Sequence, residues 1–139
     1  MMEPSKQRSE ETLLADLRSF VRAETLSKKL KKLPHGFYGD LRELISRMEK
    51  ERTVAVNSHD YERFAELAHQ IETIRGDFRQ LIHKRMEKIG VFALYGKENE
   101  SLSTIVGEER AYVMELVELA SKHKGLLLDE QGSNSTVAD

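Results

Sequence analysis

The feature that most constrains this fold is one long amphipathic stretch, which begins at the capping cluster 57–60 and ends near Leu94. Apolar residues recur along it every three or four positions, which is the period of an α-helix. They form two adjoining stripes: Tyr61, Phe64, Ala68, Ile71, Phe78, Ile82, Ile89 and Phe92 in the first, and Leu67, Ile74 and Leu81 in the second. Two stripes predict that this long helix has packing neighbours on more than one side. A helix of about 36 residues spans about 54 Å, longer than a compact domain of this size, so we expect the second stripe to contact a partner chain.

Three shorter helices are predicted by the same spacing, at about 10–23, from 34–37 to about 53, and at 104–123. Pro34 suits a first helical turn, because its missing N–H costs nothing there. The link 24–33 is either an extra helical turn or an irregular segment, and Gly125 is expected to end the last helix. Because no strand pattern occurs, we predict an all-α bundle of about four helices with one long central helix. Residues 1–124 form the domain, and 125–139 form a linker or tail.

Composition excludes several classes of protein. The chain has no cysteine, which excludes disulfides and thiolate metal sites. It has no apolar run near the roughly 18–20 residues of a membrane span and no apolar signal core at its start, so we expect a cytoplasmic protein. Residues 1–97 hold 19 Lys and Arg against 15 Asp and Glu, a charge of +4, whereas 98–139 hold 3 against 9, a charge of −6. That basic excess is weak for a dedicated DNA-binding protein.

Candidate catalytic and metal-binding residues are few. Glu66-x-x-His69 matches one unit of a di-iron bundle, but such a site needs a second unit, which no other histidine provides. No phosphate loop and no nucleophile elbow occurs, so we expect no metal, no cofactor and no catalysis. The enzymatic alternative is a helical bundle of the chorismate mutase type, in which basic side chains bind a dianionic substrate. Its candidates are Arg42, Arg47, Arg85 and Lys88.

Arg85 and Lys88 stand out because they interrupt the apolar stripe formed by Ile82, Met86 and Ile89. A charge within a buried stripe needs a partner. Glu24 and Glu109 are both candidate partners, and the sequence does not choose between them. The other basic residues of this half, Arg75, Arg79 and Lys84, form either a contact surface for an acidic partner or DNA, or a solvated face paired with acids such as Glu72.

The stretch "KKLKKLPHGFYG" at 28–39 has two interpretations. Its lysines, Lys28, Lys29, Lys31 and Lys32, could contact DNA or an acidic partner. Alternatively the stretch is a helix joint with a charged exterior, in which Leu30 and Leu33 face inward and the lysines stay in water. The apolar spacing favours the joint, with Pro34 at the start of the next helix and Phe37 and Tyr38 anchoring it.

Three segments together carry a family resemblance. The first, 26–51, has the form L-x-x-L-P-x-x-F-Y followed by an amphipathic helix. The second, "RMEKIGVFAL" at 85–94, has the form R-x-x-K-I-x-x-x-A-L, and after a loop a helix opens with "GEERAYVMELVEL". This series resembles the helical A domain of archaeal GINS subunits, of the type that carries its A domain first. The likeness covers roughly 13–120.

The resemblance implies a non-catalytic replication factor at replication forks. GINS assembles as a tetramer, homomeric or mixed, whose core is built by the long helices of its A domains. It joins the MCM helicase and a RecJ-like protein. By this likeness, seven residues of the two motifs shape the fold and the subunit packing: Leu33, Pro34, Phe37, Tyr38, Arg85, Lys88 and Ile89. Phe78 and Ile82 on the long helix are further candidates for the subunit interface. Subunits of this type carry a β-rich B domain after the A domain, and only about fifteen residues follow Gly125, too few for a domain. Either this member lacks the module or the chain is truncated.

Overall fold

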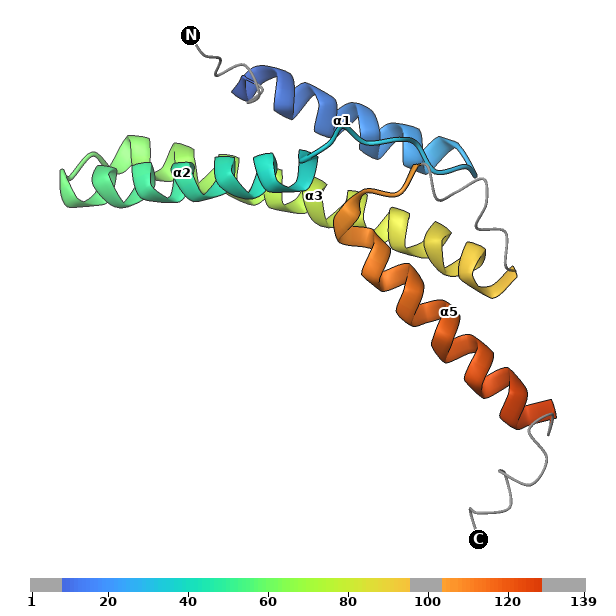
Figure 1. The fold of residues 1–139 in the computed structure, drawn as a ribbon. Helices are drawn as coiled ribbons and strands as arrows, with labels where there is room; N and C mark the ends of the chain where they lie inside the picture. Colours follow the sequence, from blue (N-terminus) through green and yellow to red (C-terminus); the bar gives the residue numbers. More distant parts are fainter. Residues whose placement is uncertain (1–8, 96–103, 129–139) are drawn as a thin grey trace, which may run out of the picture.

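The computed structural model describes residues 9–95 and 104–128. Within these ranges the chain is all-helical, as predicted, and contains no strand. Its helices are α1 (Glu10–Leu26), α2 (Phe37–Asn57), α3 (Tyr61–Tyr95) and α5 (Gly107–Leu128). Figure 1 shows α2 and α3 as an antiparallel pair, α1 lying along them, and α5 leaving the bundle from the middle of α3. No helix in the described ranges is both long and apolar enough to cross a membrane.

Helix α2 begins at Phe37, within the predicted range 34–37, but Pro34 does not lie in its first turn as expected. Pro34 precedes the helix, and its carbonyl accepts a hydrogen bond from Phe37 N at 3.1 Å. The residue that caps α2 is Gly36, whose φ of 75° lies in the left-handed region. Glycine adopts this conformation without a steric penalty, and it prevents a continuous helix from Pro34 to Phe37. The helix therefore begins three residues later than its proline suggested.

The turn between α2 and α3 closes with a pair of backbone bonds. His59 N donates to Val56 O at 3.1 Å, and Asp60 N donates to Ala55 O at 2.8 Å, which is the Schellman pattern. His59 occupies the left-handed position with φ 64°, where a side chain costs roughly 1–2 kcal/mol. Asp60 Oδ1 then accepts from Arg63 N at 3.2 Å and caps α3. The predicted capping cluster is thereby confirmed.

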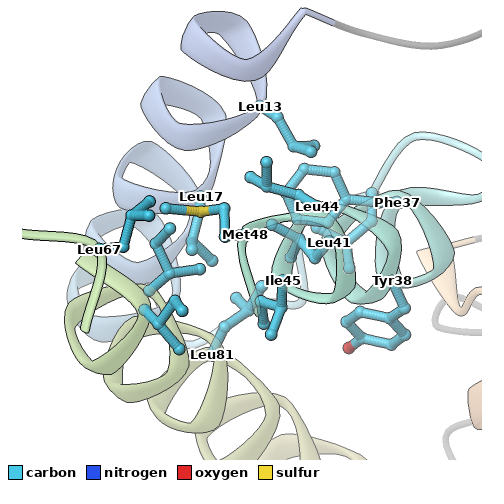
Figure 2. Packing of buried hydrophobic residues seen from close by; sticks show 13 residues of the cluster. Leu13, Leu17, Phe37, Tyr38, Leu41, Leu44, Ile45, Met48, Leu67 and Leu81 are labelled. Atoms are coloured by element: carbon cyan, nitrogen blue, oxygen red, sulfur yellow. The ribbon is translucent and has the colours of Figure 1, made fainter. Parts of the chain in front are cut away.

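Two hydrophobic cores follow one another along α3. The first is shared by α1, α2 and the first two thirds of α3 (Figure 2), and its members include Leu13, Leu17, Phe37, Leu41, Leu44, Met48, Leu67, Ile71, Ile74 and Leu81. The second lies under α5 and contains Leu30, Ile89, Ile105 and Val113. A long helix can therefore be covered within one chain, because different helices pack against its two halves.

This arrangement corrects the expectation for the second stripe of α3. Its residues Leu67, Ile74 and Leu81 are between 0% and 4% exposed within the single chain, so they need no partner chain. Two residues assigned to the apolar stripes are instead open to solvent, Tyr61 at 60% and Met86 at 39%. The prediction that α3 has neighbours on more than one side is confirmed, but those neighbours are α1, α2 and α5.

Gly125 does not end the last helix. α5 continues through it to Leu128, so the predicted boundary between 124 and 125 falls inside a helix. Within the described ranges, the only positive φ angles are at Gly36 and His59, which shows that Gly125 lacks the left-handed conformation of a helix stop. A glycine inside a helix costs about 1 kcal/mol, and the leucines at 126–128 favour propagation.

Candidate functional site

The centre of the candidate site is Arg85, a charged residue inside the fold. It lies one helical turn after Leu81 and one turn before Ile89, and all three residues are 0% exposed. Leu81 belongs to the first core and Ile89 to the second. The guanidinium therefore occupies the boundary between the two cores, where water cannot solvate it and protein groups must.

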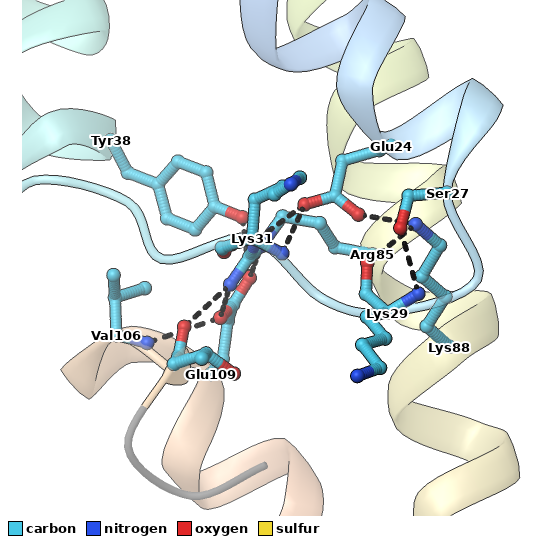
Figure 3. Close-up of polar contacts among 10 residues, drawn as sticks. Glu24, Ser27, Lys29, Lys31, Tyr38, Arg85, Lys88, Val106 and Glu109 are labelled. Carbon is cyan, nitrogen blue, oxygen red and sulfur yellow. Dashed lines mark hydrogen bonds and ion pairs between the residues drawn. The ribbon is translucent and has the colours of Figure 1, made fainter.

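The protein satisfies every N–H of this guanidinium (Figure 3). With Glu109 the contact is bidentate, from Nε to Oε2 at 2.7 Å and from Nη2 to Oε1 at 2.9 Å. Nη1 donates to Glu24 Oε2 at 2.8 Å and to the carbonyl of Lys31 at 2.6 Å. The last N–H, on Nη2, donates to the carbonyl of Thr104 at 3.0 Å. The sequence left Glu24 and Glu109 as alternative partners, and Arg85 binds both.

Glu24 connects Arg85 to Lys88 and to the irregular link after α1. Its Oε1 accepts from Lys88 Nζ at 2.6 Å, and its Oε2 also accepts from Lys31 N at 3.0 Å. Lys88 Nζ donates in addition to the carbonyl of Lys29 at 3.1 Å. The link is thus irregular for a physical reason, because its backbone groups complete the solvation of buried charges.

Glu109 fixes the start of α5 to the same network. Its Oε1 accepts from Val106 N at 3.2 Å, while Glu109 N donates to Val106 O at 2.9 Å, as in the glutamate half of a capping box. Its Oε2 accepts from Tyr38 Oη at 2.5 Å. We call the set Glu24, Tyr38, Arg85, Lys88 and Glu109 the ionic junction. It ties α1, α2, α3 and α5 together with two cations and two carboxylates.

Two pKa values in the junction respond to this environment. Burial raises the pKa of the Tyr38 hydroxyl well above its ordinary value, and the hydrogen bond to the Glu109 carboxylate raises it further. For Arg85, burial by itself lowers the pKa of the guanidinium, but the hydrogen bonds and the charge of Glu109 outweigh it, so that its pKa is raised. Tyr38 therefore stays protonated as a donor and Arg85 stays charged.

Most predicted site residues lie in the interior of the single chain. Leu33, Phe37, Tyr38, Arg85 and Ile89 are buried, whereas Pro34, Phe78, Ile82 and Lys88 are half-buried. The lysine-rich stretch behaves as a helix joint: Leu30 and Leu33 are 7% and 2% exposed. The side chains of its lysines, Lys28, Lys29, Lys31 and Lys32, are exposed.

The basic residues that the mutase alternative requires do not line one pocket. Arg42 lines a groove between α2 and α3 and pairs with Glu108 at 3.3 Å, while Lys88 lines a different hollow beside α1. Arg85 is enclosed by carboxylates. The expected pairing of Arg75 with Glu72 is replaced by an ion pair between Arg75 and Glu49 on α2. No group of three or more metal-ligating side chains occurs among the described residues.

The helix α5 forms an exposed arm, which was not predicted from the sequence. Several of its large apolar side chains are open to solvent: Met114, Val117, Leu119, Leu126, Leu127 and Leu128, from 39% to 87% exposed. These positions lie on several sides of the helix, which is typical of a helix that is buried on more than one side. One face is polar, with Glu115, Glu118 and Lys122, and the spread of apolar residues over the other faces was the signal in the sequence.

Comparisons with protein-family models, curated proteins and solved structures found no significant match to the chain.

Proposed function

We propose that the chain is a non-catalytic subunit of a GINS-like DNA replication complex, which scaffolds the replicative helicase through helix-mediated oligomerisation. The proposal places it in the cytoplasm at replication forks, in a homomeric or mixed tetramer. Its partners are an MCM helicase and a RecJ-like protein, carried over from the sequence resemblance of the three segments.

The observation that carries this proposal is the convergence of the three segments in the ionic junction. The first segment supplies Tyr38 and the carbonyl of Lys31, the second supplies Arg85 and Lys88, and the third supplies Glu109. The residues that define the resemblance therefore act as one physical unit. This favours a shared fold over three unrelated short matches.

The arm α5 supports the part of the proposal that concerns assembly. The junction holds its first turn, and hydrophobic contacts hold Val113 against Ile89. Beyond these contacts the arm extends from the bundle (Figure 1). Several of its large apolar side chains are exposed. Exposed apolar surface is typical of protein–protein interaction sites, so the arm supports an assembly.

The experiment that tests the proposal is a pull-down of the purified chain against MCM and RecJ-like proteins, with nuclease-treated samples. We expect retention of at least one of the two without DNA. The variant Met114→Asp places a charge on the exposed arm. It should weaken retention of the partner protein while leaving the circular dichroism spectrum unchanged. Failure of the folded chain to retain either protein contradicts the proposal. Retention that disappears with nuclease or added salt supports a direct DNA-binding function instead.

A further inference from the structure

A groove on the surface of the α2–α3 pair is the strongest unassigned feature. It has a volume of about 400 Å³, and its floor contains Ile45, Phe78 and Ile82. Its rim carries Arg42, Ser46, Glu49, Arg75 and Arg79. Arg79 is exposed and makes no ion pair with any residue in the described ranges. The groove thus combines an apolar floor with a rim of net positive charge.

This groove faces away from α1. On α3 the groove residues are Phe78 and Ile82, whereas the hollow shared with α1 is lined by Thr73 and Asp77. With about 3.6 residues per turn, these two sets lie on opposite faces of α3. Helix α1 therefore does not cover the groove, and within the described part of the chain α5 reaches its rim through Glu108, which pairs with Arg42.

The arm α5 carries a matching face. Glu109 and Val113 pack against α3, so Met114 and Glu118 lie on the opposite, outward side of the helix. Met114 is 64% exposed, and Glu115 and Glu118 are also exposed and make no ion pair within the described part. An outward-facing side of α5 cannot reach a groove walled by the α3 on which α5 itself sits. It can reach the groove of a second copy.

The charges of the two surfaces agree in order and spacing. On α2, Arg42 precedes Glu49 by seven residues, and on α5, Glu115 precedes Lys122 by the same seven. Each pair spans about 10.5 Å along its helix. With α5 parallel to α2, Arg42 meets Glu115 and Glu49 meets Lys122. In that register Glu118 meets Arg79, and Met114 enters the apolar floor.

We infer that the outward face of α5 docks into the α2–α3 groove of a second copy of this chain, and that a two-fold pair exchanges two arms. This inference rests on the assembly in the proposed function and names the surfaces that make it. The existing ion pair between Arg42 and Glu108 does not block it, because both side chains are about half exposed, and such pairs are weak and exchangeable.

A charge-exchange experiment tests this docking. Arg79→Glu and Glu118→Arg each place like charges opposite one another, so each variant alone should associate about tenfold more weakly than the wild type. A mixture of the two variants restores opposite charges in the contact and should regain association. Arg47→Glu, on the far side of α2, is the matched control and should associate as the wild type does. If the mixture associates no more tightly than either variant alone, the inference is wrong.

Cross-linking supplies an independent measurement, because the chain has no cysteine. Ser46→Cys marks the groove and Leu119→Cys marks the arm, because Leu119 is level with Ser46 in this register and is 53% exposed. We expect a disulfide between a Ser46→Cys chain and a Leu119→Cys chain, in clear excess over a mixture of Arg47→Cys and Leu119→Cys. If the wild type sediments as an assembly but the first mixture cross-links no better than the second, this docking is wrong while the assembly stands. If the wild type sediments as a monomer, both the docking and the assembly are contradicted.

Discussion

Arg85 Nε lies 2.7 Å from Glu109 Oε2, and this contact joins the middle of α3 to the first turn of α5. The two residues are 24 positions apart. Neither side chain has appreciable contact with solvent, at 0% and 9% exposed. A buried ion pair adds little stability compared with an apolar pair, but losing one partner leaves an uncompensated charge.

Arg85→Leu should therefore strongly destabilise the fold. The substitution leaves Glu24 and Glu109 buried without their shared cation, and we expect a loss of about 3–5 kcal/mol in the free energy of unfolding. Urea denaturation followed by circular dichroism measures this loss. Arg47→Leu on the exposed face of α2 is the control and should change stability by less than about 0.5 kcal/mol. A loss below about 1 kcal/mol for Arg85→Leu would show that the junction is open to water.

Tyr38→Phe should change how stability depends on alkaline pH. The folded-state pKa of Tyr38 is raised above its ordinary value of 10.0, so the hydroxyl is neutral in the folded state at pH values where it ionises in the unfolded state. The contribution of this hydroxyl to the free energy of unfolding is complete below pH 10 and is lost as pH rises above that value. Between pH 10 and 12, the wild type should lose about 1.4 kcal/mol per pH unit more than Tyr38→Phe. Parallel stability curves for the two proteins would contradict the raised pKa.

Ile89→Asp tests the second core. Ile89 is 0% exposed and packs with Leu30, Ile105 and Val113, so a carboxylate there should cost at least about 3 kcal/mol. The milder Ile89→Val should cost only about 1 kcal/mol. Thermal melting distinguishes the two variants, and an unchanged melting temperature for Ile89→Asp would show that α5 does not cover this position.

His59→Gly should stabilise the turn between α2 and α3. His59 has a φ of 64°, and glycine removes the steric penalty of that conformation. Glycine also raises the conformational entropy of the unfolded chain, which offsets part of the gain. We expect a net gain of about 0.5–1 kcal/mol, measured by urea denaturation. His59→Ala keeps the strained Cβ and should bring no gain. Equal stabilities for the glycine and alanine variants would mean that the turn is not strained.

Much of the helical architecture could be predicted from local patterns. Apolar spacing located the helices, the cluster at 57–60 located the start of α3, and inward-facing Leu30 and Leu33 resolved the lysine-rich stretch. These features depend on neighbours within a turn or two of the chain. The lost helix stop at Gly125 and the delayed start of α2 depend on backbone conformation, which a residue type only biases.

The ionic junction could be predicted only in part. Two charges within an apolar stripe showed that Arg85 and Lys88 needed partners, and both candidate carboxylates were found. The remaining ligands are the carbonyls of Lys29, Lys31 and Thr104. Every residue has a carbonyl, so the sequence carries no signal for these contacts. The coverage of α3 was mispredicted for a related reason, since apolar stripes do not tell whether the helix that covers them belongs to the same chain.

The measurement that most directly tests the proposed scaffold is the mass of the purified chain by light scattering, across concentrations up to about 100 μM. The chain alone has a mass of 16.0 kDa. Helix-mediated assembly through the exposed arm predicts a dimer of about 32 kDa or a tetramer of about 64 kDa. The same assembly predicts that Met114→Asp shifts the mass toward the monomer. A folded wild-type chain that stays at 16.0 kDa throughout this range would contradict it.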